Sequence, residues 1–253
     1  MRGVLTLLFF VFSFFVFSQS EIDPKSVCGS CNLLPGQVDK FAEALKESKL
    51  HYYTEQGTNK LDLKKANEEC NVNYFSICYD MLVLTSTGQK KDRTEIRQKK
   101  KLTLNDYSEM VFEAAIFDTP KDNPKKGVTI AQIHSSAEGV KRPLLRVEVA
   151  GGKEIRSIFT DTYIKGEGKS ENDFLVPFDD GDLILCSLVI EEADDKVAVS
   201  VYNKTKDKRA TKQYSAGELW KQKDGEFYFK AGAYTQVSGP KTAVFYNNFQ
   251  YKY

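Results

Sequence analysis

Three short segments of the chain place large polar side chains at every second position, and chemistry is most feasible there. The segments are Arg93–Arg97 (RTEIR), Gln132–His134 (QIH) and Tyr228–Tyr234 (YFKAGAY). In a β-strand successive side chains point to opposite faces, so each segment would have one polar and one apolar face. A sheet built from them would carry guanidinium, amide, imidazole, ammonium and phenol groups on one side. Such a surface suits an acidic, hydroxyl-rich ligand.

These residue types argue against several common hydrolytic sites. The chain has two histidines, His51 and His134, and no HxH or HExxH pattern, which argues against a catalytic zinc site. A serine or cysteine triad would lack the nucleophile-elbow pattern. A glycosidase needs two placed carboxylates, but Glu95 is the one acid in the three segments. We expect Arg93 and Arg97 to hold Glu95 ionised as a structural partner.

Breaking a uronate polymer by β-elimination fits the same groups better. The reaction removes the C5 proton beside the carboxylate, which is feasible when the developing enolate charge is stabilised. Arginine, amide and imidazole groups converging on that carboxylate would stabilise the charge, and one such donor is typically worth ~10²–10³ in rate. A tyrosine could protonate the leaving glycosidic oxygen, which contributes about 10²–10⁴. This chemistry requires no metal and no organic cofactor.

The N-terminus predicts a cleavable secretory signal over residues 1–20. Arg2 precedes an apolar run at 4–17, and small residues follow at Ser18 and Ser20. The run is about 14 residues long, shorter than the ~20 needed for a membrane-spanning helix. A retained signal anchor is the alternative. We therefore expect a secreted, extracellular protein that has no membrane partner after signal cleavage.

The charge pattern gives little support for a nucleic-acid partner. The formal net charge is +1, so any attraction for a polyanion must be local. Basic residues concentrate between Lys90 and Lys101, where the Lys99–Lys101 run is expected to be solvated. Because the chain is expected to be secreted and has no strongly basic domain, we predict no nucleic-acid binding.

Five cysteines in a secreted chain predict disulfides. Cys28, Cys31, Cys70 and Cys78 lie in the N-terminal third, where we expect two bridges whose connectivity the sequence leaves open. Cys186 lies inside an apolar run and is expected to be a buried free thiol. Cys28 and Cys31 form a CxxC motif, but no thioredoxin-like βαβ pattern follows it, which argues against a redox role.

The arrangement of apolar runs predicts one all-β domain over residues 21–253, with a cysteine-bearing extension at 21–80 packed on it. Helical spacing predicts one helix over residues 38–50. The sequon at Asn203 predicts a surface turn. Many strands and few helices indicate a β-sandwich or jelly roll. Strands are predicted at 81–85, 110–117, 128–134, 144–149, 183–190, 197–202, 227–236 and 243–253.

Taken together and in order, the three segments resemble the signature blocks of the polysaccharide lyase family 7 alginate lyases. The matching blocks are RTEIR at 93–97, QIH at 132–134 and YFKAGAYTQ at 228–236, and the resemblance runs from about Met81 to the C-terminus. It implies a β-jelly roll sandwich with a concave substrate-binding sheet, beside the short helical N-terminal element. It also implies cleavage of alginate, a mannuronate and guluronate polymer, by the elimination described above, without a cofactor.

The resemblance implies roles for individual residues. Arg93, Gln132 and His134 would neutralise the uronate carboxylate. Tyr234 would be the catalytic acid, and also the base for residues whose C5 proton lies on its own side, while His134 would be the base for the opposite epimer. Ile133, in the middle of QIH, is associated with tolerance of guluronate. Positions expected to line the cleft and bind substrate are Arg97, Lys230, Tyr228 and Gln236, and for Tyr228 a purely structural role is equally open.

Two alternative functions stay open. A jelly roll can bind glycans without cleaving them, so a non-catalytic carbohydrate-binding protein is the first alternative. The full set of Arg93, Gln132, His134 and Tyr234 argues against it. The second is a lyase for another polyuronate such as glucuronan, because the chemistry at the carboxylate is shared. The prediction is a secreted alginate lyase that acts within the polymer and works as a monomer.

Overall fold

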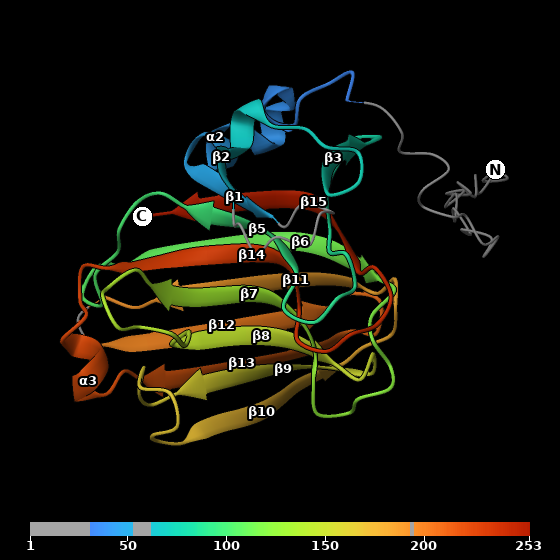
Figure 1. The fold of residues 1–253 in the computed structure, drawn as a ribbon. Coiled ribbons are helices and arrows are strands. Elements are labelled where there is room, and N and C mark those ends of the chain that lie inside the picture. Colours follow the sequence, from blue (N-terminus) through green and yellow to red (C-terminus); the bar gives the residue numbers. More distant parts are fainter. Residues whose placement is uncertain (1–30, 53–61, 193–194) are drawn as a thin grey trace, which may run out of the picture.

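Two antiparallel β-sheets packed face to face form the fold (Figure 1). The computed structural model describes residues 31–52, 62–192 and 195–253. The expected signal at 1–20 and Cys28 lie outside these residues. Within the described residues, no helix is long and apolar enough to cross a membrane.

The first sheet has eight strands and will be called the cleft sheet. Its strands in spatial order are β10 (Ser170–Pro177), β9 (Glu154–Thr160), β8 (Leu145–Ala150), β7 (Gly127–Ser135), β14 (Phe227–Thr235), β5 (Arg93–Gln98), β1 (Ser48–Tyr52) and β2 (Asp62–Lys65). The second sheet has seven strands, in the order β13 (Lys208–Ser215), β12 (Lys196–Asn203), β11 (Leu183–Ile190), β6 (Ser108–Phe117), β15 (Ala243–Lys252), β4 (Met81–Thr85) and β3 (Phe75–Cys78). Short helical elements are η1 (Pro35–Gln37), α2 (Asp39–Lys46), η2 (Ala66–Glu68) and α3 (Glu218–Lys221).

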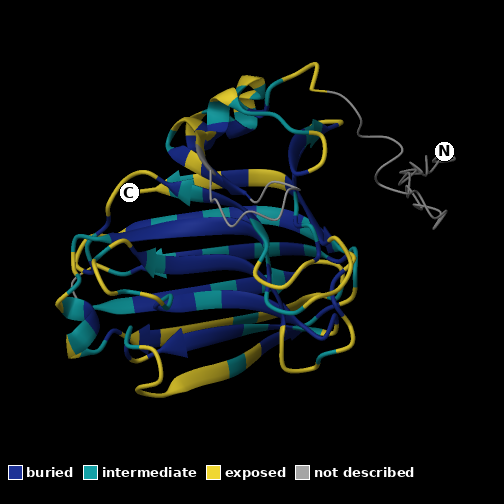
Figure 2. Ribbon diagram, viewed as in Figure 1, coloured by how far each residue is buried: buried dark blue, intermediate teal, exposed yellow. Residues whose placement is uncertain are grey.

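Alternating apolar residues build the core between the two sheets. Every second residue of β6 from Met110 to Ile116, and of β11 from Ile184 to Ile190, is buried against the cleft sheet. Fully burying one such aliphatic or aromatic side chain contributes roughly 1.5–3 kcal/mol. Figure 2 shows the central strands buried, whereas the edge strand β10 has long exposed stretches. The architecture confirms the predicted all-β jelly roll.

The state of the cysteines in the described residues agrees with two predictions made from the sequence: disulfides in the N-terminal third and a free thiol at Cys186. Cys31 and Cys70 form a disulfide, and Cys78 is also disulfide-bonded. Cys186 is a buried free thiol, as predicted. Burial raises the pKa of the Cys186 thiol, so little of the reactive thiolate forms.

The N-terminal part differs from the prediction because tertiary pairing ends the helix early. The helix predicted over 38–50 extends only over Asp39–Lys46, and the following residues form strand β1. Pairing with β5 places Leu50 opposite Ile96 and buries both side chains in the core. The expected extension therefore contributes strands β1 and β2 to the cleft sheet and β3 to the second sheet.

The turn predicted at the sequon is present, but Asn203 itself is not on the surface. Its side chain is buried at the end of β12. The amide Nδ2 donates to the carbonyl oxygen of Pro177 at 2.9 Å and to Asp182 Oδ2 at 2.8 Å. These two hydrogen bonds keep the Asn203 amide inside the fold, while the predicted surface turn begins directly after it.

Candidate active site

The three polar segments lie on adjacent strands of the cleft sheet, in the order β7, β14 and β5. Backbone pairing aligns their polar residues in rows across the sheet: Tyr234 opposite Arg93, and Tyr228 opposite His134. Lys230 pairs with Arg97 on one side and Gln132 on the other. Paired residues in a sheet point to the same face, so the expected shared polar face exists.

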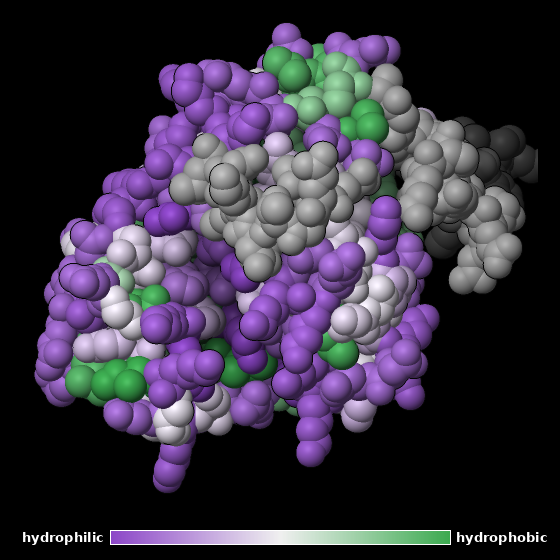
Figure 3. Space-filling view, in the orientation of Figure 1, coloured by the Kyte–Doolittle hydropathy of each residue, from purple (hydrophilic) through white to green (hydrophobic). Residues whose placement is uncertain are grey.

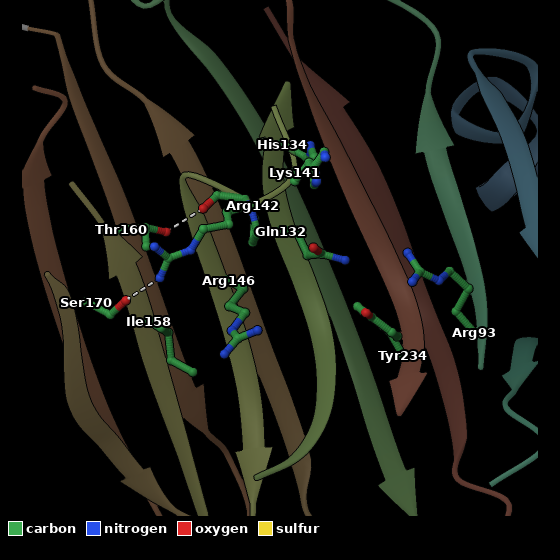
Figure 4. A pocket seen from close by; sticks show the side chains of 11 residues that line it. Arg93, Gln132, His134, Lys141, Arg142, Arg146, Ile158, Thr160, Ser170 and Tyr234 are labelled. Carbon is green, nitrogen blue, oxygen red and sulfur yellow. Dashed lines mark hydrogen bonds between the residues drawn. The ribbon is translucent and has the colours of Figure 1, made fainter. Parts of the chain in front are cut away.

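A cavity of about 230 Å³ opens on this face, and Figure 4 shows the side chains around it. Arg93, Gln132, His134 and Tyr234 all line it, so the four residues predicted to carry catalysis come together. Its remaining wall comes from β8, β9, β10 and the β7–β8 loop. Four cationic side chains and no carboxylate line the cavity among the described residues. Figure 3 shows mostly hydrophilic residues on this side of the molecule.

A buried carboxylate, Glu95, organises the floor beside the cavity. It is 1% exposed, and Lys230 Nζ lies 2.5 Å from its Oε2. Gln132 Nε2 donates to its Oε1, and an Arg93 guanidinium nitrogen lies 3.7 Å from Oε2. Burial alone would raise the pKa of Glu95, but the charges of Lys230 and Arg93 and the two hydrogen bonds outweigh burial and lower it. Glu95 is therefore ionised, as predicted, although Arg97 has a different contact.

Gly232 makes room for this arrangement. It pairs with Glu95 across β14 and β5 and has a φ of +151°, a conformation that side chains rarely adopt. A Cβ atom at this position would lie 2.1 Å from the carbonyl oxygen of Thr94. A β-bulge between Ala231 and Tyr234 lies at the same place, on the side of β14 that faces β7. The glycine therefore permits the close approach of strands that brings Tyr234 beside Arg93.

The contact with Glu95 fixes the orientation of the Gln132 amide. An ionised carboxylate can only accept hydrogen bonds, so the Nε2 side of the amide must face it. The amide oxygen of Gln132 therefore points away from Glu95. Nε2 carries a second hydrogen, which remains for a ligand in the cavity.

His134 is a neutral imidazole in this environment. Burial, followed by the positive charge of Lys230, lowers its pKa to about 4. Its Nδ1 lies 2.8 Å from both the backbone nitrogen and the carbonyl oxygen of Ser135. Its ring stacks on Tyr228, with centroids 5.7 Å apart and an interplanar angle of 15°. The contacts with Ser135 occupy Nδ1, and the stacking on Tyr228 fixes the orientation of the ring. The other ring nitrogen, Nε2, is left for hydrogen bonding or proton transfer.

Each arginine of the first motif packs on a tyrosine of the third. The guanidinium carbon of Arg93 lies 3.8 Å from the Tyr234 ring centroid, and that of Arg97 lies 4.0 Å from the Tyr228 ring centroid. These are cation–π contacts. Tyr228 is buried, and its burial raises the pKa of its hydroxyl. Because Tyr228 does not line the cavity and Tyr234 does, the geometry favours Tyr234 as the group that reaches a substrate.

Four residues were predicted to bind substrate, but none of them is among the described residues that line this cavity: Arg97, Tyr228, Lys230 and Gln236. Lys230 is 3% exposed and bonded to Glu95. Arg97 and Tyr228 stack on each other, and Gln236 donates to Thr129 Oγ1 at 3.1 Å. Ile133 is buried in the core, so it can influence a substrate only through its neighbours.

Sequence reasoning missed the cavity wall formed by β8, β9 and β10. The residues concerned are Lys141, Arg142, Pro143, Arg146, Ile158, Thr160 and Ser170. One signal was available: Leu145–Val149 alternates apolar and charged residues, as the three motifs do. The remaining wall residues come from loops and edge strands, which carry no such alternation.

His51 was also missed as a member of this face. It pairs with Glu95 in the neighbouring strand and is 4% exposed, and neither ring nitrogen has a hydrogen-bond partner among the described residues. Burial, followed by the charge of Lys230 and then of Arg97, lowers its pKa to about 2. His51 is therefore neutral, and no cluster of three or more potential metal ligands occurs in the described part of the chain.

Comparison with known families decides the class of the protein. A family model described as alginate lyase matches residues 44–252. The chain belongs to the alginate lyase family. It is therefore a polysaccharide lyase, which confirms the family expected from the three motifs. The match also begins well before Met81, so β1 and His51 of this alginate lyase lie within the family region.

Solved alginate lyase structures share the fold. AlyC3 aligns with a TM-score of 0.72 at 18% sequence identity, covering 90% of this chain and 96% of AlyC3. A1-II′, a member of polysaccharide lyase family 7, aligns with a TM-score of 0.68 at 18% identity, covering 86% of this chain and 97% of its own. The alginate lyase from Klebsiella pneumoniae gives 0.68 at 14% identity, with 87% and 99% covered. No curated protein sequence gives a significant match.

Proposed function

We propose that this alginate lyase is secreted and cuts alginate within the polymer by β-elimination that needs no metal ion. One observation carries the proposal. The side chains of Arg93, Gln132, His134 and Tyr234, from three separate strands, converge on one cationic cavity. A cavity whose described lining has four positive side chains and no carboxylate suits a polyuronate, whose every sugar carries a negative charge.

The uronate carboxylate would bind at Arg93, the free hydrogen of Gln132 Nε2 and His134. These donors reduce the negative charge on the carboxylate and so make the neighbouring C5 proton easier to remove. As that proton leaves, charge builds on the carboxylate oxygens, where the donors are already positioned by Glu95 and Tyr228. Donors that need no reorganisation during the reaction stabilise the transition state more than the ground state.

Each cleavage breaks the C5–H and C4–O bonds and forms a C4–C5 double bond. The electron pair of C5–H becomes the double bond, and the electron pair of C4–O leaves with the glycosidic oxygen. Tyr234 donates a proton to that oxygen, and the base receives the C5 proton. The base is Tyr234 for one epimer and neutral His134 for the other, since their side chains reach the cavity from different strands. When His134 is the base, its Nε2 carries the lone pair, so Arg93 and Gln132 hold the carboxylate, and the proton that His134 gains returns through solvent to Tyr234. The low pKa of His134 keeps its imidazole unprotonated at neutral pH.

The position of the cavity supports cleavage within the polymer. Strands β8 to β10 extend the cleft sheet on one side, and β5, β1 and β2 extend it on the other. Sugars on both sides of the cleaved bond would therefore have sheet surface beneath them.

Alginate is the proposed substrate, and glucuronan is the alternative. AlyC3 has been solved in complex with dimannuronate, and A1-II′ in complex with the substrate GGMG. Secretion rests on the apolar N-terminal segment, and metal independence rests on the cationic side chains that would stabilise the developing charge.

The test uses the purified mature protein with alginate, separated mannuronate and guluronate blocks, and glucuronan. Ultraviolet absorbance of the unsaturated sugar measures elimination, and each reaction is run with and without exhaustive chelation. We expect activity on alginate that survives chelation, with products of intermediate length appearing early. No absorbance rise on any alginate fraction would refute the function, and an activity lost on chelation and restored by metal would refute the metal-free mechanism.

A further inference from the structure

Arg146 stands out among the arginines of the cavity because its guanidinium lacks a hydrogen-bond acceptor within the described residues. It lies on β8, paired with Gln132 of β7 and with Ile158 of β9, and therefore points to the cleft face. Its Nε is buried without a hydrogen-bond partner. The carboxylate oxygen paired with it, Glu148 Oε2, is 3.7 Å away, beyond hydrogen-bonding distance.

The positive charges of Arg146 and of its neighbour Arg156 are only partly neutralised by the nearby carboxylate of Glu148. Glu148 is fully buried and accepts hydrogen bonds from Arg156 at 2.9 Å and from the backbone nitrogen of Gly127 at 3.0 Å. One carboxylate thus serves two guanidinium groups and leaves a net positive charge at the cavity wall. Burial lowers the pKa of Arg146, which reflects a desolvation cost that an anionic ligand would offset.

The other two arginines of the wall already have partners. Arg142 donates to the carbonyl oxygen of Glu167 at 3.1 Å and to Ser170 Oγ at 2.9 Å, which ties two loops together. Arg93 packs on Tyr234 and lies near Glu95. Arg146 is therefore the arginine with the greatest capacity for a new anionic ligand, and its side chain is 28% exposed.

Arg146 and Arg93 project from opposite sides of the cavity, with Gln132 and Tyr234 between them (Figure 4). Their strands, β8 and β5, are three strand spacings apart, roughly 14 Å. A polymer bound across the strands would therefore present different carboxylates to the two arginines. Ile158 beside Arg146 offers an apolar surface for the C–H face of a sugar ring.

We propose that Arg146 and Ile158 form a second uronate subsite, which binds the carboxylate of a sugar next to the one held by Arg93, Gln132 and His134. This inference rests on the proposed function. Loss of a hydrogen bond to a charged group corresponds to about 10–100-fold in affinity. Because the second carboxylate does not take part in bond breaking, the loss appears mainly in KM rather than in kcat.

The experiment measures direct binding of alginate oligosaccharides of increasing length to a Tyr234→Phe protein, with and without Arg146→Gln. The added substitution should weaken binding about 10–100-fold for oligosaccharides long enough to reach both subsites, and leave the shortest ones unaffected. Arg146→Lys, which keeps the charge and the packing, should give an intermediate loss. Arg209→Gln removes the same charge on β13 of the second sheet, where Arg209 packs on Tyr202, and should change nothing.

Equal affinity of the parent and both Arg146 variants for long oligosaccharides would overturn the subsite, and so would an equal loss at every length. Methyl esterification of the oligosaccharide carboxylates supplies a further check. Esterification should weaken binding to the Arg146→Gln protein by a smaller factor than it weakens binding to the parent protein, because the variant already lacks one of the charge pairs that esterification removes. Turnover by the wild-type protein is measured separately, so failure of the proposed function is distinguishable from failure of the subsite.

Discussion

Glu95→Gln removes one negative charge from the floor of the site while keeping the size of the side chain. Glu95 is 1% exposed and Lys230 is 3% exposed, so the substitution leaves a buried ammonium without its counterion. Removing one partner of a buried ion pair typically costs about 3–5 kcal/mol. We therefore expect the free energy of unfolding at neutral pH to fall by about 3–5 kcal/mol.

The same substitution changes the pH dependence of stability, and its sign follows from Lys230. Without Glu95, the pKa of Lys230 in the folded state falls further below its unfolded value of about 10.4. Between these two pKa values the unfolded state binds more protons than the folded state, so stability rises with pH. Denaturant unfolding at about pH 7 and about pH 9 should show the variant partly recovering at the higher pH.

Activity should also fall, because a glutamine at position 95 has one acceptor oxygen and cannot accept hydrogen bonds from both Lys230 and Gln132, so the amide of Gln132 is no longer held in place. A misplaced donor at the carboxylate costs about 10²–10³ in kcat. The matched control is Glu113→Gln on the second sheet, where Glu113 pairs with the partly exposed Lys204. That pair should contribute no more than about 1 kcal/mol, with no effect on kcat. A Glu95→Gln protein with wild-type stability and wild-type kcat would refute the organising role of this carboxylate.

Three further predictions concern the neighbours of Glu95. Gly232→Ala should destabilise the fold by at least roughly 1–3 kcal/mol and reduce kcat, because the strained φ and the contact with the Thr94 carbonyl oxygen push β14 away from β5; unfolding and turnover measurements check both effects. His51→Gln should remove about 1.4 kcal/mol per pH unit from the slope of stability against pH between about pH 6 and pH 4. In the wild type, the lowered pKa of His51 gives stability that is full above about pH 6.5 and is lost as the pH falls, so an unchanged slope would contradict its buried, neutral state. Tyr228→Leu should slow cleavage of the epimer that uses His134 as base more than the other, whereas Tyr228→Phe, which keeps the ring stack, should preserve the ratio on separated blocks.

The central strands were predictable because their alternation reflects burial on one face. β11 was predicted with its observed bounds, and β6 within two residues, since every second side chain faces the core. The edge strands β10 and β13 have mostly exposed side chains and no apolar alternation, so nothing in their sequence distinguished them from loops. β1 was mistaken for helix because its pairing with β5 depends on residues far away in the chain.

The motifs predicted which residues share the polar face, but they could not predict the contacts between strands. The bond from Gln132 to Glu95 spans three strands, and it depends on register and on the close approach at Gly232. The resemblance to the family implied that Lys230 lines the cleft, but its bond to Glu95 holds it in the floor. Arg146 lies outside all three motifs, and only the pairing of β8 with β7 brings it to the cavity.

Turnover of alginate by a Tyr234→Phe protein tests the central claim most directly. The substitution removes the hydroxyl that donates the proton to the glycosidic oxygen, but it keeps the ring on which Arg93 packs. The variant should bind the polymer with wild-type affinity and lose at least about 10²–10⁴ in kcat, measured by ultraviolet absorbance of the unsaturated product. A variant that kept the wild-type kcat would contradict the assignment of Tyr234 as the catalytic acid.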